Sequence, residues 1–362
     1  MAKLGEVCLL KAGKFVSAND ISPEYNKGLY PCFGGNGIRG YVADYTHDGE
    51  FPLIGRQGAL CGNVNLASGK FHATEHAVVV QPKTEMNVHW LYYALNAMNL
   101  GQYATGAAQP GLAVSKLETL SIEIPNISEQ NKIAQTLYKV EQLVNFRKQQ
   151  LAKLDELVKA RFVEMFGDPV VNSKRWPVET IENHIDLLTG FPFDSSGYVS
   201  KGVNICGGLI IMPQKIDWSA CKHWPQITGY EDYILRPNDI VIALDRPWIS
   251  NGFKIAMVDR EHLPALLIQR TARIRAVDIN QRYLMQSLLL GRFDKHCNIT
   301  GSLVPHISPK DIKSYSVMIP PIELQNQFAT FVERVDQQKQ TVQQSLEKLE
   351  LMKKALMQEY FG

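Results

Sequence analysis

The stretch GGNGIRG holds the spacing G-x-G-x-x-G through Gly35, Gly37 and Gly40. This is the spacing of the loop that binds the pyrophosphate of a dinucleotide, provided that a strand precedes it and a helix opens at its last glycine. Here the chain continues as YVADYTHDGEFPLI, with Gly49 and Pro52 at the positions that the helix would occupy. The sequence therefore argues against a dinucleotide site.

Two interpretations of these glycines remain. They could form only a tight connection between strands, or they could let backbone amides approach a ligand closely, with Asn36 and Arg39 presented beside them. Other signatures of catalysis are missing from the sequence: no G-x-x-x-x-G-K-[ST], no H-E-x-x-H, no G-x-S-x-G and no Asn/Asp-Pro-Pro-Tyr/Phe of an amino-methyltransferase. The sequence predicts a protein that is not itself an enzyme.

Composition narrows the class of protein. The chain has 362 residues, of which 45% are hydrophobic and 20% charged, with a formal net charge of +2. This length suits two domains, and a net charge near zero leaves nucleic-acid binding open because a basic face can be balanced elsewhere. The 6 cysteines are scattered without a C-x-x-C pair, which predicts reduced thiols, a cytoplasmic protein and no metal site. A membrane protein is not expected, because no run of about 18 apolar residues occurs.

The chain repeats itself. Residues 121–167 align without a gap on residues 316–362, so that Pro125 falls on Pro320 and Gly167 on Gly362 at a constant offset of 195. About 18 of the 47 paired positions are identical. Such self-similarity at a fixed offset indicates a repeated structural unit, and the sequence therefore predicts two copies of one unit.

Each copy ends in a long helix. Apolar residues recur at steps of three, four or their sum, which is the pattern of a coiled-coil seam. In the first copy they are Ile133, Leu137, Val140, Val144, Leu151, Leu154 and Val158, and in the second they are Phe328, Val332, Val335, Val342, Leu346, Leu349 and Leu356. We predict a helix over roughly 127–166 that pairs antiparallel with its counterpart, over about 60 Å. The alternative is that each helix joins a separate partner protein.

The rest of each copy is β-rich. Short β-branched runs such as HAVVVQPK, DIVIALD and TARIRAV alternate with Gly, Pro and Asn, while HWLYYALNAM and QRYLMQSLLL predict one helix at equivalent places. The expected fold is α+β, with two β-rich globules joined by two long helices in an antiparallel coiled coil with a pseudo-twofold repeat. The predicted boundaries are 1–124 and 168–319 for the globules, and 125–167 and 320–362 for the helices.

This organisation resembles the specificity subunit of type I restriction-modification systems. The resemblance covers nearly the whole chain and includes I-P-x-x-x-x-Q at each helix entry, F-G near each helix end, YPCFGGNGIRGYV, IGRQGALCGNV and RPNDIVIAL. It implies that each globule is a target recognition domain that reads one half of a split double-stranded DNA site. It also implies that the helices set the spacing and dock two modification subunits. Those subunits bind S-adenosylmethionine and methylate adenine, and a translocating restriction subunit joins some complexes. One departure is that the second globule lacks a counterpart of GGNGIRG and has CGGLIIMPQ in its place.

The candidate DNA-binding residues are polar side chains in Gly-flanked loops. Arg and Lys can contact guanine, Asn and Gln can contact adenine, and cations can contact phosphates. In the first globule the candidates are Asn36, Arg39, Arg56, Gln57, Lys70 and Gln109, and in the second they are Arg246, Trp248, Lys254, Gln269, Arg270 and Ser302. The competing hypothesis is a coiled-coil adaptor whose globules bind protein; only a DNA-binding chain would shift duplex DNA in a salt-dependent way.

Overall fold

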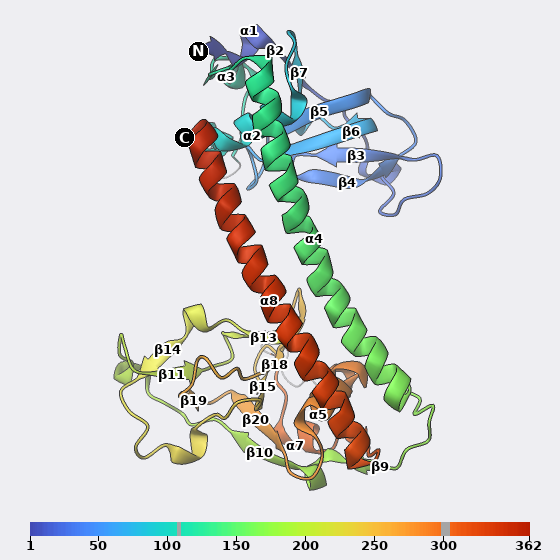
Figure 1. Cartoon of the computed structure of the whole chain (residues 1–362), viewed down its shortest axis with the longest axis vertical. Coiled ribbons are helices and arrows are strands. Elements are labelled where there is room, and N and C mark those ends of the chain that lie inside the picture. The colour runs from blue at the N-terminus through green and yellow to red at the C-terminus, as the bar shows by residue number, and fades with distance from the viewer. Residues whose placement is uncertain (107–109, 298–304) are drawn as a thin grey trace. The chain divides into compact units, whose positions relative to one another are not determined.

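The computed structural model describes residues 1–106, 110–297 and 305–362 (Figure 1). Contacts divide the chain into two units. Unit 1 comprises Met1–Gln149 and Gln343–Gly362, and unit 2 comprises Gln150–Val342. Each unit therefore contains one globule and a part of each long helix.

The elements of unit 1 alternate short strands with a few helices. The strands are β1 (Ala2–Lys3), β2 (Cys8–Ala12), β3 (Tyr30–Gly34), β4 (Gly37–Val42), β5 (His47–Gly55), β6 (Val64–Ala73), β7 (Ala77–Pro82) and β8 (Ser121–Ile122). The helices are α1 (Leu4–Val7), α2 (Val88–Ala97), α3 (Val114–Glu118) and the first part of α4 (Ile127–Phe166). The helix expected in HWLYYALNAM is α2, and the expected long helix is α4.

The elements of unit 2 follow the same plan with more interruptions. The strands are β9 (Val178–Thr180), β10 (Ile185–Thr189), β11 (Val203–Cys206), β12 (Ile211–Met212), β13 (Lys215–Ile216), β14 (Lys222–Trp224), β15 (Ile240–Ala243), β16 (Trp248–Ile249), β17 (Gly252–Phe253), β18 (Ile255–Met257), β19 (Ala265–Leu267), β20 (Thr271–Ala276) and β21 (Ser316–Met318). The helices are α5 (Gln281–Leu290), α6 (Phe293–His296), α7 (Pro309–Lys313) and the first part of α8 (Ile322–Phe361).

The strand order is the same in the two globules. In unit 1 one sheet has the order β2-β7-β5-β6-β3-β4, in which only β3 and β6 are parallel neighbours. In unit 2 the order β10-β20-β15-β18 continues in a second sheet as β19-β11-β14, and again the pair β11 and β19 is parallel. The long strand β6 corresponds to both β18 and β19, because residues 258–264 leave the sheet between them. The predicted internal repeat is therefore present in the topology.

The two long helices pair antiparallel, as predicted. Within unit 1, Lys353 Nζ of α8 lies 2.6 Å from Glu141 Oε1 of α4. Within unit 2, Lys339 Nζ of α8 lies 2.6 Å from Asp155 Oδ1 of α4. The residue numbers of the ion-paired side chains thus fall along α8 as they rise along α4, which is the pattern of an antiparallel pair. Ion pairs that keep partial contact with solvent contribute little free energy, so the buried apolar seam of the pair supplies most of its stability.

Each globule is closed by a helix end that belongs to the other copy of the repeat. In unit 1 the end of α8 packs into the core, where the Phe361 ring lies 6.4 Å from that of Trp90. In unit 2 the end of α4 packs in the same way, with the Phe166 ring 4.7 Å from that of Tyr283. The F-G ending seen in both copies therefore marks a packing contact.

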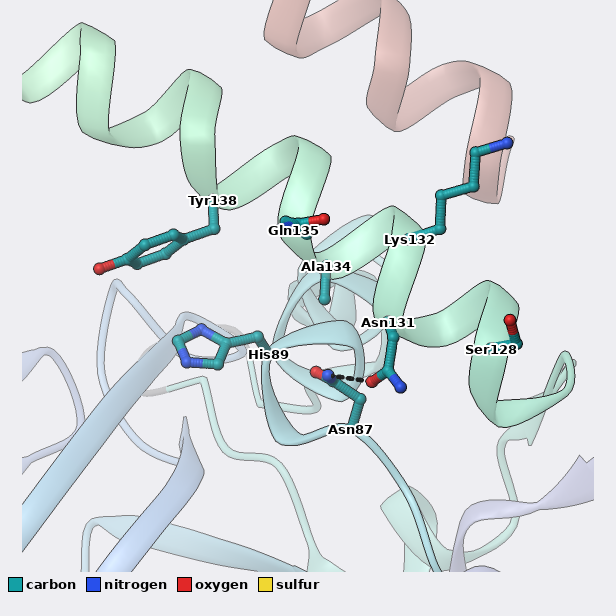
Figure 2. A pocket seen from close by; sticks show the side chains of 8 residues that line it. All are labelled: Asn87, His89, Ser128, Asn131, Lys132, Ala134, Gln135 and Tyr138. Carbon is teal, nitrogen blue, oxygen red and sulfur yellow. Dashed lines mark hydrogen bonds between the residues drawn. The ribbon is translucent and has the colours of Figure 1, made fainter.

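The glutamine of the I-P-x-x-x-x-Q motif fastens each long helix to its globule. Gln130 is 2% exposed; its Nε2 donates to the Pro125 carbonyl at 2.8 Å and its Oε1 accepts from the Asn87 amide at 2.9 Å. Asn87 caps α2, and its side chain also donates to Asn131 Oδ1 of α4 at 2.7 Å (Figure 2). Gln325 makes the same two hydrogen bonds in unit 2.

A cleft of about 540 Å³ lies beside this junction in unit 1, between the start of α2 and the first turns of α4. Figure 2 shows His89 and Tyr138 facing each other across it, with ring centroids 5.4 Å apart. In unit 2 the positions equivalent to these two rings are Arg282 and Glu333, which form an ion pair. The two junctions therefore share the glutamine that joins the long helix to its globule. They differ in the side chains beside it, which are two rings in unit 1 and an ion pair in unit 2.

All 6 cysteines are free, and burial raises the pKa of the Cys8 thiol to about 11. In the described parts of the chain, no helix is long and apolar enough to cross a membrane.

Candidate nucleic-acid interface

Both globules bring the same loops together at one end of the sheet. In unit 1 the Arg56 amide donates to the His76 carbonyl at 3.0 Å, and the Arg56 carbonyl accepts from the Leu112 amide at 2.9 Å. In unit 2 the Leu244 amide donates to the Arg270 carbonyl, and the Leu244 carbonyl accepts from the Ile307 amide. We call these regions the sheet-end loops: residues 34–36, 56–63, 74–76 and 110–112 in unit 1, and residues 207–209, 244–247, 268–270 and 305–307 in unit 2.

The glycine-rich stretch makes a tight connection in the sheet-end loops. Gly34 pairs with Gly37, so that Gly35 and Asn36 form the turn between β3 and β4. A Cβ on Gly55 would lie 2.0 Å from the Gly35 carbonyl oxygen, so two backbones approach too closely for any other residue. The glycines therefore form a tight connection between strands, which is the first of the two interpretations left open by the sequence. Whether a ligand also approaches these amides stays a prediction.

The second globule has a counterpart of the first two glycines, which corrects the expectation that it has none. Phe33 accepts from the Thr74 amide just as Cys206 accepts from the Ile268 amide, so Gly207 and Gly208 follow β11 as Gly34 and Gly35 follow β3. Beyond this point the copies diverge. The chain returns at once as β4 in unit 1, whereas the hairpin of β12 and β13 intervenes in unit 2. CGGLIIMPQ thus begins with the two equivalent glycines, and the inserted hairpin replaces the rest of the glycine-rich stretch.

Three predicted residues of the first globule lie together in its sheet-end loops. Asn36 is exposed, and its Oδ1 accepts from Asn63 Nδ2 at 2.7 Å, which holds the amide in place. Gln57 is exposed directly beyond β5, where it forms a bridge with Gly111. Arg56 is half-buried, and its Nε has no hydrogen-bond partner. This group offers both amide and guanidinium chemistry.

Arg39 and Lys70 are placed differently. Arg39 is exposed on β4 at an irregularity where the register with β3 shifts, and its Cβ lies 3.9 Å from the position that a Cβ on Gly34 would take. Lys70 lies on β6 opposite Asp48, and its ammonium is 4.7 Å from the centroid of the Tyr45 ring. Lys70 therefore contacts a different set of residues from the turn that carries Asn36.

In unit 2 a cleft of about 530 Å³ opens among the sheet-end loops. Of the predicted residues, Arg246, Lys254, Gln269 and Arg270 line it. The cleft also contains Lys222 and a single carboxylate, Asp245, which already pairs with Arg270 at 3.1 Å and with His306 at 2.6 Å. Its excess of cations favours a polyanionic ligand.

Two predicted residues of unit 2 do not project from the surface. Lys254 is 6% exposed and donates from Nζ to the Gly208 carbonyl; burial, followed by the charge of Arg246, lowers its pKa. Trp248 is half-buried and packs against the core, with its ring 5.0 Å from that of Phe253. Both residues lie on or beside the hairpin of β16 and β17. The sequence did not reveal that one side of this hairpin faces the core. The other two candidates, Gln109 and Ser302, lie outside the described residues.

Glu75 and His76 are not among the residues predicted from the sequence. These residues occupy the turn before β7 that corresponds to Gln269 and Arg270 before β20. Glu75 Oε1 lies 3.1 Å from His76 Nε2. Aligning HAVVV on RTARI would have shown the correspondence. In the described residues no group of His, Cys, Asp and Glu is suited to hold a metal ion.

The long helices expose apolar side chains at equivalent positions of the two copies. Ile127 is 36% exposed and its equivalent Ile322 40%. Leu157 is 46% exposed and its equivalent Met352 51%. By contrast, Leu143 is 46% exposed but corresponds to the polar Gln338. We call Ile127, Leu157, Ile322 and Met352 the repeated apolar positions.

The family model described as "Type I restriction modification DNA specificity domain" matches residues 1–156 and 227–351. The chain belongs to this family. The match includes most of both globules and both long helices, so membership applies to the repeat as a whole and not to one copy.

Relatives agree with this assignment. The chain is 53% identical over 143 residues to the type I restriction enzyme EcoprrI specificity subunit of Escherichia coli, a match that spans 39% of this chain and only 36% of the relative. It is 23% identical over 320 residues to the MjaVIII specificity subunit of Methanocaldococcus jannaschii, spanning 83% of this chain and 75% of the relative. Both relatives are named as specificity subunits, in agreement with the predicted family.

Solved structures share the fold. The S subunit of a type I restriction-modification system from M. genitalium has a TM-score of 0.65 at 18% identity, covering 99% of this chain and 95% of its own. A chain from a structure titled for complex assembly and conformational transition of the type I R-M system has a TM-score of 0.53 at 14% identity, with coverage of 99% and 96%. At these identities the likeness establishes the α+β fold with its paired helices.

Proposed function

We propose that this chain is the DNA sequence-specificity subunit of a type I restriction-modification complex, in which each globule reads one half of a bipartite target. The observation that carries the proposal is the repeated position of the sheet-end loops. The two copies build these loops on equivalent strands and furnish them with different polar side chains. One framework with two sets of contact residues suits two different half-sites.

The chemistry of the two sets fits duplex DNA. In unit 1, Asn36 and Gln57 offer amides of the kind that pair with adenine, and Arg39 and Arg56 offer donors for guanine or phosphate. In unit 2 the cationic cleft offers Arg246 and Arg270 in the same roles. Lys254 is buried, so it contributes through its positive charge, which adds to the electrostatic potential of the cleft.

The adaptor hypothesis is less well supported. An adaptor would need no excess of cations in the cleft of unit 2, and the matching family is described by DNA specificity. A shift of duplex DNA that weakens with added salt separates the two hypotheses, because phosphate contacts release counterions.

The partners follow from the same proposal. Two methyltransferase subunits dock on the long helices, and the repeated apolar positions support this because they offer the same side-chain type twice on one repeated frame. S-adenosylmethionine is bound by those subunits and not by this chain. A restriction subunit joins the complex when DNA is cleaved, and the complex acts in the cytoplasm.

The helices also set the spacing between the half-sites. α4 is a continuous helix of 40 residues that contributes to both units, and α8 is its antiparallel equivalent. A helix of this length is about 60 Å long and resists bending, whereas a loop would leave the separation undefined.

Exchange of one globule tests the proposal. Residues 1–120 are replaced by those of a relative that reads another site and that keeps Trp90, so that the contact with Phe361 survives. The chimera is co-expressed with the methyltransferase subunits, and methylated adenines are mapped across the genome. We expect one half of the motif to change and the other to persist. A change in both halves, or a motif with no second half, would contradict modular reading.

A further inference from the structure

We infer that Glu75 and His76 determine specificity in the first globule, where Glu75 recognises a base that carries an exocyclic amino group, cytosine or adenine. The inference rests on the proposed function and deepens it. It assigns a role to a glutamate and a histidine that lie outside the glycine-rich stretch.

Glu75 and His76 occupy the position in unit 1 that Gln269 and Arg270 occupy in unit 2. The His76 carbonyl accepts from the Arg56 amide as the Arg270 carbonyl accepts from Leu244, so the pair Glu75–His76 is equivalent to Gln269–Arg270. That second pair lines the cationic cleft of unit 2. The same turn, immediately before the same strand, therefore presents a different polar pair in each globule.

The sheet-end loops of unit 1 contain unpaired polar atoms. Glu75 Oε2, His76 Nδ1 and Arg56 Nε are all buried without a hydrogen-bond partner. In the described residues seven side-chain atoms share this condition, and these three come from one set of loops. A buried polar atom without a partner is unfavourable, because it has lost its hydrogen bonds to water and gained none in exchange. These loops therefore contain side-chain polar atoms whose hydrogen-bonding capacity is not used within the chain.

A base edge can supply the missing partners. The Glu75 and His76 side chains are 33% and 38% exposed, so a small rotation would present the unpaired atoms at the surface. Side-chain rotations of this kind are common at interfaces. A carboxylate only accepts hydrogen bonds, and in the major groove the amino groups of cytosine and adenine are the donors. Arg56 would donate to guanine in the same region.

Two variants test the inference. Glu75→Gln keeps the shape of the side chain and adds a donor. The double variant Glu75→Gln with His76→Arg installs the pair that the equivalent turn of unit 2 already accommodates. Glu50→Gln is the matched control, because Glu50 also pairs with a histidine, His89 of α2, at 3.3 Å, outside the sheet-end loops. Each full-length variant is co-expressed with the methyltransferase subunits, methylated adenines are mapped, and thermal unfolding is recorded.

We expect both variants to change or relax one position of a single half-site, with preference for the original base lowered about tenfold or more, and the control to keep the motif. An unchanged motif in both variants, with or without a lower melting temperature, would overturn the inference and leave the pair a structural one. In that case a bipartite motif in the unaltered complex would still uphold the proposed function. If the unaltered complex methylated no such motif, both would fall.

Discussion

Gln130 shows what a single residue of the repeated motif does. Its side chain is buried and joins the Pro125 carbonyl, just before α4, to the amide of Asn87, which caps α2. Gln325 repeats these bonds on Pro320 and Asn280. A motif that is recognisable in sequence as a family resemblance is thus, in physical terms, a clamp between a helix and its globule.

Removing this clamp should destabilise the fold. In Gln130→Ala the Asn87 amide and the Pro125 carbonyl lose their partners in a buried setting, which costs about 1–3 kcal/mol of the free energy of unfolding. Gln135→Ala, an exposed position on the same helix, is the control and should change stability by less than about 0.5 kcal/mol. Denaturant unfolding measures both. Equal effects of the two substitutions would show that the buried bonds contribute nothing specific.

We expect the side chains of Arg39 and Arg56 in the first globule to contribute to DNA recognition and not to the stability of the fold. Arg56→Ala and Arg39→Ala are each expected to weaken binding of the target duplex by about 1–3 kcal/mol and to relax the first half-site. Arg334→Ala, an exposed arginine on α8, is the control for general loss of positive charge. Affinity is measured at one fixed salt concentration together with the methylation motif. Normal affinity and an unaltered motif in both variants would remove these residues from the interface.

Individual site residues were only partly predictable. Asn36, Arg56 and Gln57 could be assigned to loops because glycines flank them, but the sequence did not predict that these loops lie together. The burial of Lys254 and Trp248 could not be predicted, because whether a short hairpin faces the core or the solvent depends on what packs over it and not on its own composition. Glu75 and His76 were missed because the offset between the copies changes with every loop insertion.

At the scale of elements, the long helices were the most predictable part of the chain. Their seam positions recur at a helical period, and the bounds Ile127–Phe166 match the expected 127–166. The sequence did not show that the end of each helix packs into the globule of the other copy. Phe166 and Phe361 have the same neighbours in sequence whichever globule they close, so the exchange becomes visible only in the fold.

The repeated apolar positions should govern docking. Leu157→Asp and Met352→Asp each place a charge where a partner would bury an apolar side chain, so each is expected to reduce the number of bound methyltransferase subunits from two to one. The double variant should bind none. Leu143→Asp is the control, since Leu143 is as exposed as Leu157 but has a polar equivalent. Native mass spectrometry of the purified complex counts the subunits, and full occupancy of the double variant would rule out this surface.

At the scale of the whole molecule, the constant offset of 195 was enough to predict two copies of one unit, paired antiparallel through their helices. The sheet order could not be predicted, because β6 is one strand in unit 1 and corresponds to two in unit 2. The predicted domain boundaries treat each helix as a separate segment, whereas contacts assign each helix partly to unit 1 and partly to unit 2. Because each helix contributes residues to both units, helix length is the property that the proposed function links to the spacing between half-sites.

If the paired helices set the distance between the two half-sites, lengthening both helices together should lengthen the spacer between those half-sites. Four residues are inserted between Gln149 and Gln150 of α4 and four between Gln344 and Ser345 of α8, since Asp155 pairs with Lys339 and Glu141 with Lys353. Lengthening one helix alone would break this register.

Four residues add about 6 Å to each helix and turn its end by roughly 40° beyond a full turn. B-DNA rises about 3.4 Å per base pair, so the unspecified spacer between the half-sites should grow by about 1–2 base pairs. The variant is co-expressed with the methyltransferase subunits, and methylated adenines are mapped across the genome. We expect both half-sites to be unchanged and the spacer between them to be longer. An active complex that keeps the original spacer would contradict this expectation.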